Sequence, residues 1–508
     1  MRETAFILLV LAASGLQAAS AAESSSASGE ASARDFVARR FVTDHRMSIG
    51  KDTIAYTATA ADTILLDADG KPKATIFSIS YVKQPVEKAA DRPITFLFNG
   101  GPGSSAVWLH LGAFGPKRLD LPSDAINPGG PPYRLVDNPH TLLSSSDLVF
   151  VDPIGTGYSR ALGKNKNADY WGVDEDSAVI AEFIRAYLTA QRRWNSPKYL
   201  AGESYGTTRA GLLIRDLELK LLDSVFFNGV VLIAVATDIS IATDEGSSNE
   251  MPYVTNLPTF AATAYYHDAL PEKPADLDRF LEEARTFAGA EYLAALFKGS
   301  SLSAAEEQAI AAKLHRFTGL SVPYLKRCRL RVDRARFVKE LLRERGQTLA
   351  FHDTRFVGKD LDDAGENVRL DPFLLGITGP FVAVMNDYLG TELGVKVEEP
   401  YTAFSLESNQ AWKRAKGGQA LFSGFLNTTP HLAEAAATNK DFRVFVVSGL
   451  HDLATPFFGT EYVFLHSRID KERITLKNYF GGHMMYLYEP SLRQMSEDIA
   501  RFMTHERR

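Results

Sequence analysis

Cysteine is nearly absent from this chain: Cys328 is the only one among 508 residues. An intrachain disulfide is therefore excluded, and packing has to hold the fold together. A chain of this length, with 45% hydrophobic and 23% charged residues, can bury a large core, either as two domains or as one domain with an insertion.

An excess of positive charge is absent as well. The formal net charge is −6 and no long run of Lys or Arg occurs, so there is no electrostatic reason to expect a nucleic-acid partner. The metalloprotease pattern H-E-x-x-H, clusters of Cys and His, and the phosphate-binding pattern G-x-x-x-x-G-K-[ST] are missing too. We therefore expect no metal site and no phosphate loop.

One apolar run, at residues 5–16, is typical of a targeting segment. It follows a short charged start and precedes an A-x-A cleavage signature at 19–21, which predicts a secretory signal peptide over 1–21. The run is shorter than the roughly 20 residues of a membrane span, so we expect no span once the peptide is removed. Residues 22–40 follow as a flexible Ser/Ala-rich lead-in. Export without disulfides predicts a bacterial protein of the periplasm or the medium.

Alternating polar and apolar residues over 41–82 predict antiparallel strands. Short, continuous apolar runs then predict buried strands of a parallel sheet, and helical spacing over 174–194 predicts a helix between two of them. The runs are 94–98, 147–151, 198–201, 230–234, 442–448 and 473–480, and a last amphipathic helix is expected over 490–504. Strands alternating with helices in this way indicate an α/β fold with a central, mostly parallel sheet.

The pattern changes between 255 and 400, where charged segments show helical spacing and few strand signals. We interpret 255–400 as a mostly helical cap insertion. It would divide the α/β core into a first part at 41–254 and a second part at 401–508.

The sequence G-E-S-Y-G at 202–206 lies between the predicted strand at 198–201 and a helix expected from about Thr207. A G-x-S-x-G pentapeptide in this context is typical of a nucleophile elbow, a sharp turn that exposes the serine hydroxyl at the top of a sheet. Ser204 is therefore the candidate nucleophile. An ordinary glycine-rich turn is the alternative.

A serine nucleophile needs a base, and the base needs a carboxylate to orient it. Asp452 lies just beyond the carboxyl end of one predicted strand, and His483 lies just beyond that of the next. Because the carboxyl ends of parallel strands meet at one edge of a sheet, both residues are expected near Ser204. His451, next to the acid, is the alternative base.

The tetrahedral intermediate of acyl transfer also needs two backbone N–H donors. One is expected from Tyr205, directly after the nucleophile. The other is expected from the glycine-rich sequence N-G-G-P-G-S-S at 99–105, which follows the strand at 94–98. Glycines there allow the backbone to approach a ligand closely.

Four blocks of this sequence resemble the signatures of the serine carboxypeptidase family. They are F-N-G-G-P-G-S-S at 98–105, V-D-P-I-G-T-G-Y-S at 151–159, G-E-S-Y-G at 202–206 and G-H-M at 482–484. The resemblance extends over most of the chain after the lead-in and is weakest in the cap.

The resemblance implies an α/β-hydrolase fold with a catalytic triad of Ser204, Asp452 and His483. It implies oxyanion donors at the N–H groups of Gly101 and Tyr205. The implied activity is that of a serine-type carboxypeptidase, which releases C-terminal residues from peptides with a free C-terminus through an acyl-enzyme and without a cofactor. Members of the family are often dimers, so a homodimer is compatible with the resemblance.

Family members bind the free carboxylate of the substrate, and the matching positions here are Asn99, the Gly100 backbone and Glu203. An ionised Glu203 would repel a carboxylate, whereas a protonated one can donate a hydrogen bond to it. A structural hydrogen-bonding role is the alternative for Glu203. Met484 matches a position that lines the pocket for the leaving residue, with simple core packing as the alternative.

The chain departs from the family pattern at Ala113, where many members carry a second glutamate. The disulfides common among eukaryotic members are absent too. Without the second carboxyl, we expect the pH optimum for peptide cleavage to be less acidic than in members with two glutamates. The same departure leaves an esterase or acyltransferase as the alternative function. A non-catalytic binding or protective protein on this fold is a third hypothesis, against which the complete set of triad residues argues.

Overall fold

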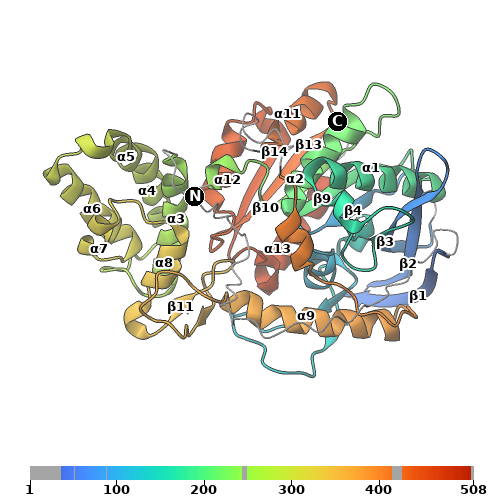
Figure 1. The fold of residues 1–508 in the computed structure, drawn as a ribbon, viewed down its shortest axis with the longest axis horizontal. Coiled ribbons are helices and arrows are strands. Elements are labelled where there is room, and N and C mark those ends of the chain that lie inside the picture. The colour runs from blue at the N-terminus through green and yellow to red at the C-terminus, as the bar shows by residue number, and fades with distance from the viewer. Residues whose placement is uncertain (1–35, 51, 87, 243–248, 415–425, 505–508) are drawn as a thin grey trace, which may run out of the picture.

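The computed structural model describes residues 36–50, 52–86, 88–242, 249–414 and 426–504. The predicted signal peptide at 1–21 and most of the predicted lead-in at 22–40 lie outside these residues. Figure 1 shows a central sheet flanked by helices, with a further group of helices to one side.

One sheet of ten strands forms the centre of the fold. Nine of them lie side by side in the order β1 (Arg40–Ile49), β2 (Asp52–Leu66), β3 (Pro72–Gln84), β7 (Asp147–Val151), β4 (Ile94–Phe98), β9 (Lys198–Ser204), β10 (Gly229–Val235), β13 (Arg443–Gly449) and β14 (Ile474–Tyr479). The tenth, β8 (Arg160–Ala161), pairs with β3. The pairs from β1 to β7 are antiparallel, and the pairs from β7 to β14 are parallel. The predicted antiparallel start and parallel centre are therefore confirmed.

Apolar residues of the central strands alternate between the two faces of the sheet. In β4, Phe96 and Phe98 belong to one buried cluster and Leu97 belongs to the other. In β13, the neighbours Val444 and Phe445 likewise belong to different clusters. Because successive side chains of a strand point to opposite faces, a strand covered on both faces has to be apolar throughout. This is why short continuous apolar runs marked these strands in the sequence.

Helices cover both faces of the sheet. One buried cluster joins it to α1 (Val173–Ala190), α2 (Tyr205–Leu213), α11 (Thr429–Thr438) and α12 (Phe457–Leu465). The other joins it to α9 (Pro372–Thr391) and α13 (Glu489–Thr504). The helices predicted over 174–194 and 490–504 correspond to α1 and α13. The architecture is the α/β arrangement that the sequence predicted.

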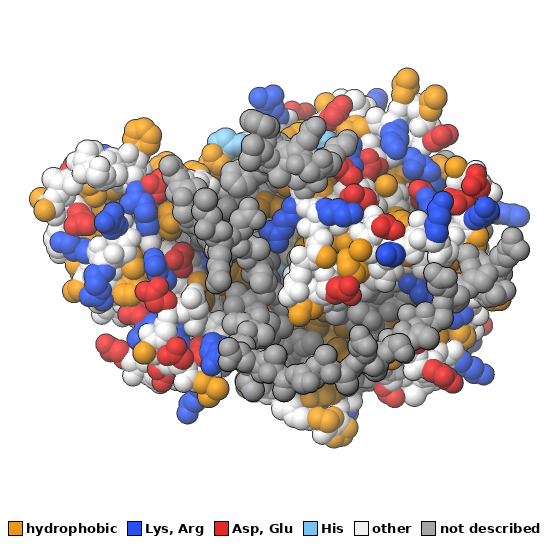
Figure 2. All heavy atoms as spheres, viewed as in Figure 1, with side chains coloured by type: hydrophobic (Ala, Val, Ile, Leu, Met, Phe, Trp, Pro, Cys, Tyr) orange, Lys and Arg blue, Asp and Glu red, His pale blue; other side chains and the backbone are white. Residues whose placement is uncertain are grey.

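Between β10 and β13 the chain forms a helical lobe, seen at the left of Figure 1. Its helices are α3 (Met251–Tyr266), α4 (Leu277–Phe287), α5 (Leu293–Lys298), α6 (Ala304–Thr318), α7 (Val322–Arg327) and α8 (Arg334–Glu340). They enclose a third apolar cluster, in which the rings of Phe260 and Phe337 stack 3.8 Å apart. Acidic and basic side chains are interspersed over the lobe in Figure 2.

After the lobe, the chain returns to the main core. β11 (Thr348–Leu349) pairs with β12 (Val357–Gly358), and α9 then packs on the sheet. Among the described residues, α9 alone is long and apolar enough to span a membrane, and half of its apolar stretch is buried. The remaining α-helix and strands are α10 (Leu406–Ala411) and the pair of β5 (Lys117–Leu119) and β6 (Leu135–Asp137).

Candidate active site

Ser204 lies at the junction of β9 and α2, where the backbone turns sharply. Its φ of 58° and ψ of −126° fall outside the regions that L residues usually occupy. The flanking residues are glycines because side chains have no space there. A Cβ at Gly202 would overlap the Gly206 carbonyl, and a Cβ at Gly206 would lie 2.7 Å from the Phe98 carbonyl oxygen. The turn has the geometry of a nucleophile elbow.

Asp452 and His483 follow the neighbouring strands β13 and β14, which pair in parallel. The loops beyond these strands are joined by a 2.8 Å hydrogen bond from the His451 N–H to the Gly481 carbonyl. Asp452 Oδ2 lies 2.8 Å from His483 Nδ1, and both side chains are buried. Within the described part of the chain, His483 makes no hydrogen bond to the Ser204 hydroxyl. Such bonds are often long until substrate binds.

Several donors hold Asp452 as an anion. Its Oδ1 accepts from the N–H groups of Ala454 and Thr455 at 2.8 and 3.1 Å, and its Oδ2 accepts from the Thr455 hydroxyl at 2.6 Å. Burial disfavours the charge, but the attraction of His483 and these hydrogen bonds outweigh it and lower the pKa of Asp452. Burial likewise opposes the imidazolium, yet Asp452 raises the pKa of His483 above its usual value. The ionised carboxylate therefore favours the tautomer with hydrogen on Nδ1 of His483.

His451, the alternative base, lies in an aromatic setting instead. Its ring packs against Tyr266 and Phe480 at centroid distances of 5.3 and 5.1 Å. Neither ring nitrogen has a hydrogen-bond partner among the described residues. Burial holds the pKa of His451 well below its usual value. The structure thus brings Asp452 together with His483 and leaves His451 apart from the carboxylate.

The glycine-rich loop at 99–105 packs directly on the elbow. A Cβ at Gly100 would lie 2.5 Å from the Tyr205 backbone nitrogen, so only glycine allows this approach. Gly101 has a φ of 102°, which glycine adopts without strain. Tyr205 begins α2, and the first N–H groups of a helix have no acceptor within it. The two residues predicted as oxyanion donors therefore belong to segments in direct contact.

A distant segment, 402–409, holds this loop in place. Ser405 N–H donates to the Gly103 carbonyl at 2.7 Å, and Asn409 Nδ2 donates to the Pro102 carbonyl at 2.9 Å. The second bond joins residues 307 positions apart. No local pattern in the sequence indicated this contact.

Glu203 is a buried carboxyl with two side-chain donors. Its Oε2 accepts from Asn99 Nδ2 at 2.8 Å and from the Tyr486 hydroxyl at 2.7 Å. Burial raises the pKa of Glu203 to about 7, against the attraction of His483 and against these two hydrogen bonds. The Leu109 N–H donates to Asn99 Oδ1 at 3.0 Å and so fixes the orientation of the amide. The Glu203 carboxyl is therefore neutral in mildly acidic solution and can donate a hydrogen bond there.

Ala113 and Met484 are both buried in the core cluster that contains Tyr486. A Cβ on the neighbouring Gly112 would lie 2.8 Å from the Tyr486 ring. The hydroxyl that bonds Glu203 therefore comes from a ring that packs against Gly112, the residue before Ala113.

Sequence reasoning missed Thr455 and Tyr486 as partners of the predicted carboxyls. Thr455 follows Asp452 by three positions, and Tyr486 follows His483 by three positions. This closeness in the sequence was the available signal that they belong to the site. It also missed the segment 351–354, which contacts both loops and carries no motif.

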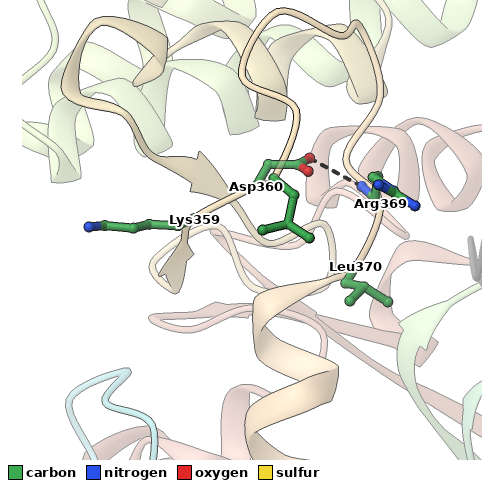
Figure 3. A pocket seen from close by; sticks show the side chains of 5 residues that line it. Lys359, Asp360, Arg369 and Leu370 are labelled. Atoms are coloured by element: carbon green, nitrogen blue, oxygen red, sulfur yellow. Dashed lines mark hydrogen bonds between the residues drawn. The ribbon is translucent and has the colours of Figure 1, made fainter.

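Two hollows in the described surface contain none of the candidate site residues. Figure 3 shows the smaller, of about 160 Å³, between β12 and α9, where Asp360 accepts a hydrogen bond from the Arg369 N–H. It is lined by Lys359, Asp360, Leu361, Arg369 and Leu370. The other, of about 370 Å³, lies at the amino end of β9. In the described ranges, no group of three or more His, Cys, Asp or Glu residues could hold a metal ion.

Known proteins resemble parts of this chain. A family model described as serine carboxypeptidase matches residues 66–223. Serine carboxypeptidase-like 44 of Arabidopsis thaliana is 30% identical over 147 residues, which are 28% of this chain and 27% of that protein. The pheromone-processing carboxypeptidase of Cryptococcus gattii is 35% identical over 119 residues, which are 23% of this chain and 16% of that protein. The chain thus spans about a quarter of the length of the first relative and about a sixth of the second.

A solved structure shares the fold over most of its length. The prohormone-processing carboxypeptidase of Saccharomyces cerevisiae matches with a TM-score of 0.53, covering 88% of this chain and 91% of that one at 14% identity. At this identity the likeness concerns the fold. Together with the mainly parallel sheet, it confirms the predicted α/β-hydrolase fold.

Proposed function

We propose that this chain, which belongs to the serine carboxypeptidase family, is a serine-type carboxypeptidase that releases C-terminal residues from peptides. The proposal rests on the 2.8 Å hydrogen bond between Asp452 Oδ2 and His483 Nδ1, at the edge of the sheet where the Ser204 elbow lies. Nucleophile, acid and base follow one another in the chain order of α/β hydrolases. The proposed substrates are peptides with a free C-terminus.

In the proposed reaction, Ser204 Oγ attacks the carbonyl carbon of the last peptide bond while His483 Nε2 takes the hydroxyl proton. Ionised Asp452 stabilises the imidazolium that forms. His483 then gives the proton to the leaving amine as the C–N bond breaks, which leaves an acyl ester on Ser204. Water, deprotonated by His483, hydrolyses this ester and regenerates the serine.

The N–H groups of Gly101 and Tyr205 are proposed to stabilise the oxyanion of the intermediate. The close packing of the glycine-rich loop on the elbow supports this role, because donors fixed in advance need no reorganisation during the reaction. The place of Tyr205 at the start of α2 supports it too, since the helix dipole favours negative charge at that end.

Asn99, the Gly100 backbone and Glu203 are proposed to bind the free carboxylate of the substrate. The pKa of about 7 for buried Glu203 supports this role, because a neutral carboxyl donates a hydrogen bond where an ionised one would repel. It also supports a pH optimum less acidic than that of members with two glutamates. Met484, next to His483, is proposed to line the pocket for the leaving residue.

The second candidate function is an esterase or acyltransferase that uses the same three residues. The observation in its favour is Ala113, which is buried and supplies no second carboxyl to pair with Glu203. Such an enzyme would prefer esters or amides that lack a free carboxylate.

We further propose that the chain is exported, with residues 1–21 removed, to a bacterial periplasm or medium. The apolar run with its A-x-A signature supports this, as does the single cysteine. N-terminal sequencing of the mature protein tests the cleavage. Light scattering behind size-exclusion chromatography tests the homodimer that the resemblance allows.

The experiment that tests the activity compares an N-blocked hydrophobic dipeptide with its C-terminal amide. We expect release of the last residue from the free acid, and a loss on the order of 10⁶ in kcat for Ser204→Ala. Equal cleavage of the amide, or reaction with simple esters only, would move the assignment to the esterase or acyltransferase. If Ser204 is not labelled by a serine-reactive phosphonate, the protein is a non-catalytic one.

A further inference from the structure

A segment of the insertion, 351–354, lies across the loops that carry the acid and the base. Leu453 N–H donates to the Phe351 carbonyl at 3.2 Å, and Thr354 N–H donates to the His451 carbonyl at 3.0 Å. These two bonds lie on either side of Asp452. The insertion therefore holds the backbone around the carboxylate that orients His483.

The same segment bonds the base itself. His483 N–H donates to the His352 carbonyl at 2.6 Å. A Cβ on Gly482 would overlap this carbonyl and the Asp353 backbone, so the base loop can approach the insertion only with glycine at that position. The main chains of His352 and His483 are thus held against each other.

The side chain of His352 forms a second histidine–carboxylate pair. Its Nδ1 lies 2.8 Å from Asp371 Oδ2, and Asp371 caps the N-terminus of α9. The Asp371 carboxylate also accepts the N–H groups of Phe351, His352, Phe373 and Leu374 at 2.9 to 3.2 Å. Burial opposes its charge, but the bond to His352 and the backbone donors outweigh burial and lower the pKa of Asp371. Asp371 is therefore an anion at neutral pH.

The His352 ring contacts the His483 ring edge to face, with centroids 5.3 Å apart. The acidic groups that act on His483 come from three elements: Asp452 from its own loop, Glu203 from the elbow, and Asp371 from the start of α9. Both Asp371 and Asp452 favour the imidazolium by charge attraction. No step proposed above uses His352 or Asp371.

We propose that His352, held by Asp371, is a positioning residue that fixes the plane of the His483 imidazole, and that the Asp371 anion stabilises the imidazolium formed when Ser204 loses its proton. This inference rests on the proposed role of His483 as the base. Loss of the Asp371 charge makes the imidazolium less stable. His483 then keeps its neutral form to lower pH but is a weaker base.

The test is the pH dependence of Ser204 labelling by a fluorophosphonate. In this reaction the Ser204 O–P bond forms, the P–F bond breaks, fluoride leaves, and His483 takes the hydroxyl proton. Labelling needs the nucleophile and the base but no carboxypeptidase activity. An enzyme that labels normally but does not cleave dipeptides would therefore refute the proposed function and leave this inference open to measurement.

Asp371→Asn is the informative variant, because asparagine also caps helices and so preserves the start of α9. We expect the acid limb of the labelling profile to move to lower pH and the plateau rate to fall about tenfold. His352→Asn keeps a donor for Asp371 but loses the ring contact, and it should lower the plateau rate while moving the acid limb less. The double variant should lose less than the product of the two single losses, because the two residues act as a pair.

The matched control is Asp276→Asn. Asp276 also caps a helix, α4, where it accepts the Arg279 N–H at 3.1 Å, and within the described part of the chain it does not contact His483. It should leave the labelling profile unchanged. The proposal would be overturned if the acid limb of Asp371→Asn coincided with those of the wild type and the control, or moved to higher pH. This holds even if the variant melted at a lower temperature.

Discussion

Tyr486 donates a 2.7 Å hydrogen bond to Oε2 of Glu203, the buried carboxyl next to Ser204. The bond joins the loop that carries His483 to the turn at Ser204, because Tyr486 follows His483 by three residues. Asn99 donates to the same oxygen, so two neutral donors face a carboxyl whose pKa burial raises to about 7. In the carboxylate site proposed above, the protonation of Glu203 therefore determines whether a substrate carboxylate is attracted or repelled.

Glu203→Gln should change how KM depends on pH. In the wild type, KM for a peptide with a free C-terminus should rise above about pH 7, because Glu203 ionises there and repels the substrate. Glutamine stays neutral, so KM of the variant should be flat across this range. Steady-state kinetics with the free-acid peptide from pH 5 to 9 measure both. A variant that kept the rise would contradict carboxylate binding by Glu203.

Tyr486→Phe should move the same transition to higher pH. The tyrosine hydroxyl favours the charged form of Glu203, so its loss raises the pKa of that carboxyl further. Stability should fall by about 1 kcal/mol, the usual net value of a buried hydrogen bond. The matched control is Tyr56→Phe, because the buried Tyr56 hydroxyl has no partner among the described residues. Equal effects of the two substitutions on the KM profile would argue against a role for the Tyr486–Glu203 bond.

Gly100→Ala should lower kcat with a smaller effect on KM. The added methyl would lie 2.5 Å from the Tyr205 nitrogen, which displaces the glycine-rich loop and obstructs a proposed oxyanion donor. Loss of one such donor typically costs about 10² to 10³ in kcat. Gly130→Ala is the control, because a Cβ there meets nothing within 4 Å. Unchanged kcat in a folded Gly100→Ala variant would place the oxyanion donors elsewhere.

Asp152→Asn should make stability less dependent on pH. Asp152 is buried, accepts the Ala106 N–H at 2.9 Å and the Tyr401 hydroxyl at 2.9 Å, and has a pKa that burial raises to about 7 from 3.8. Between these two pH values, Asp152 is therefore protonated in the folded state and ionised in the unfolded state. Stability of the wild type should fall through this range as pH rises, by about 1.4 kcal/mol for each pH unit from this group.

Asparagine does not titrate. The Asp152→Asn variant should therefore become more stable relative to the wild type as the pH is raised. Urea unfolding at pH 5 and pH 8, both in a Ser204→Ala background to prevent self-digestion, measures the difference. Parallel pH dependences of the two proteins would mean that Asp152 is ionised in the folded state at pH 5.

The strands, the elbow and the order of Ser204, Asp452 and His483 could be predicted because each depends on short-range pattern. A strand covered on both faces has to be apolar, and a turn without space for side chains has to be glycine on both sides. The contacts of Glu203 could not be predicted in the same way. Its partner Tyr486 lies 283 positions away, and its closeness to His483 in the sequence does not identify Glu203 as the partner.

The sequence by itself determined the fold class, the elbow and which residues are chemically able to act as nucleophile, acid and base, because these follow from local sterics and from periodicity. Only the tertiary structure decided that Asp452 pairs with His483 and not with His451, and that Tyr486 bonds Glu203. It also decided that the ring of His352, which is bonded to Asp371, contacts the ring of His483. The physical reason is that hydrogen-bond partners and proton affinities depend on burial and on charges brought together across the chain, and no short window of sequence contains them.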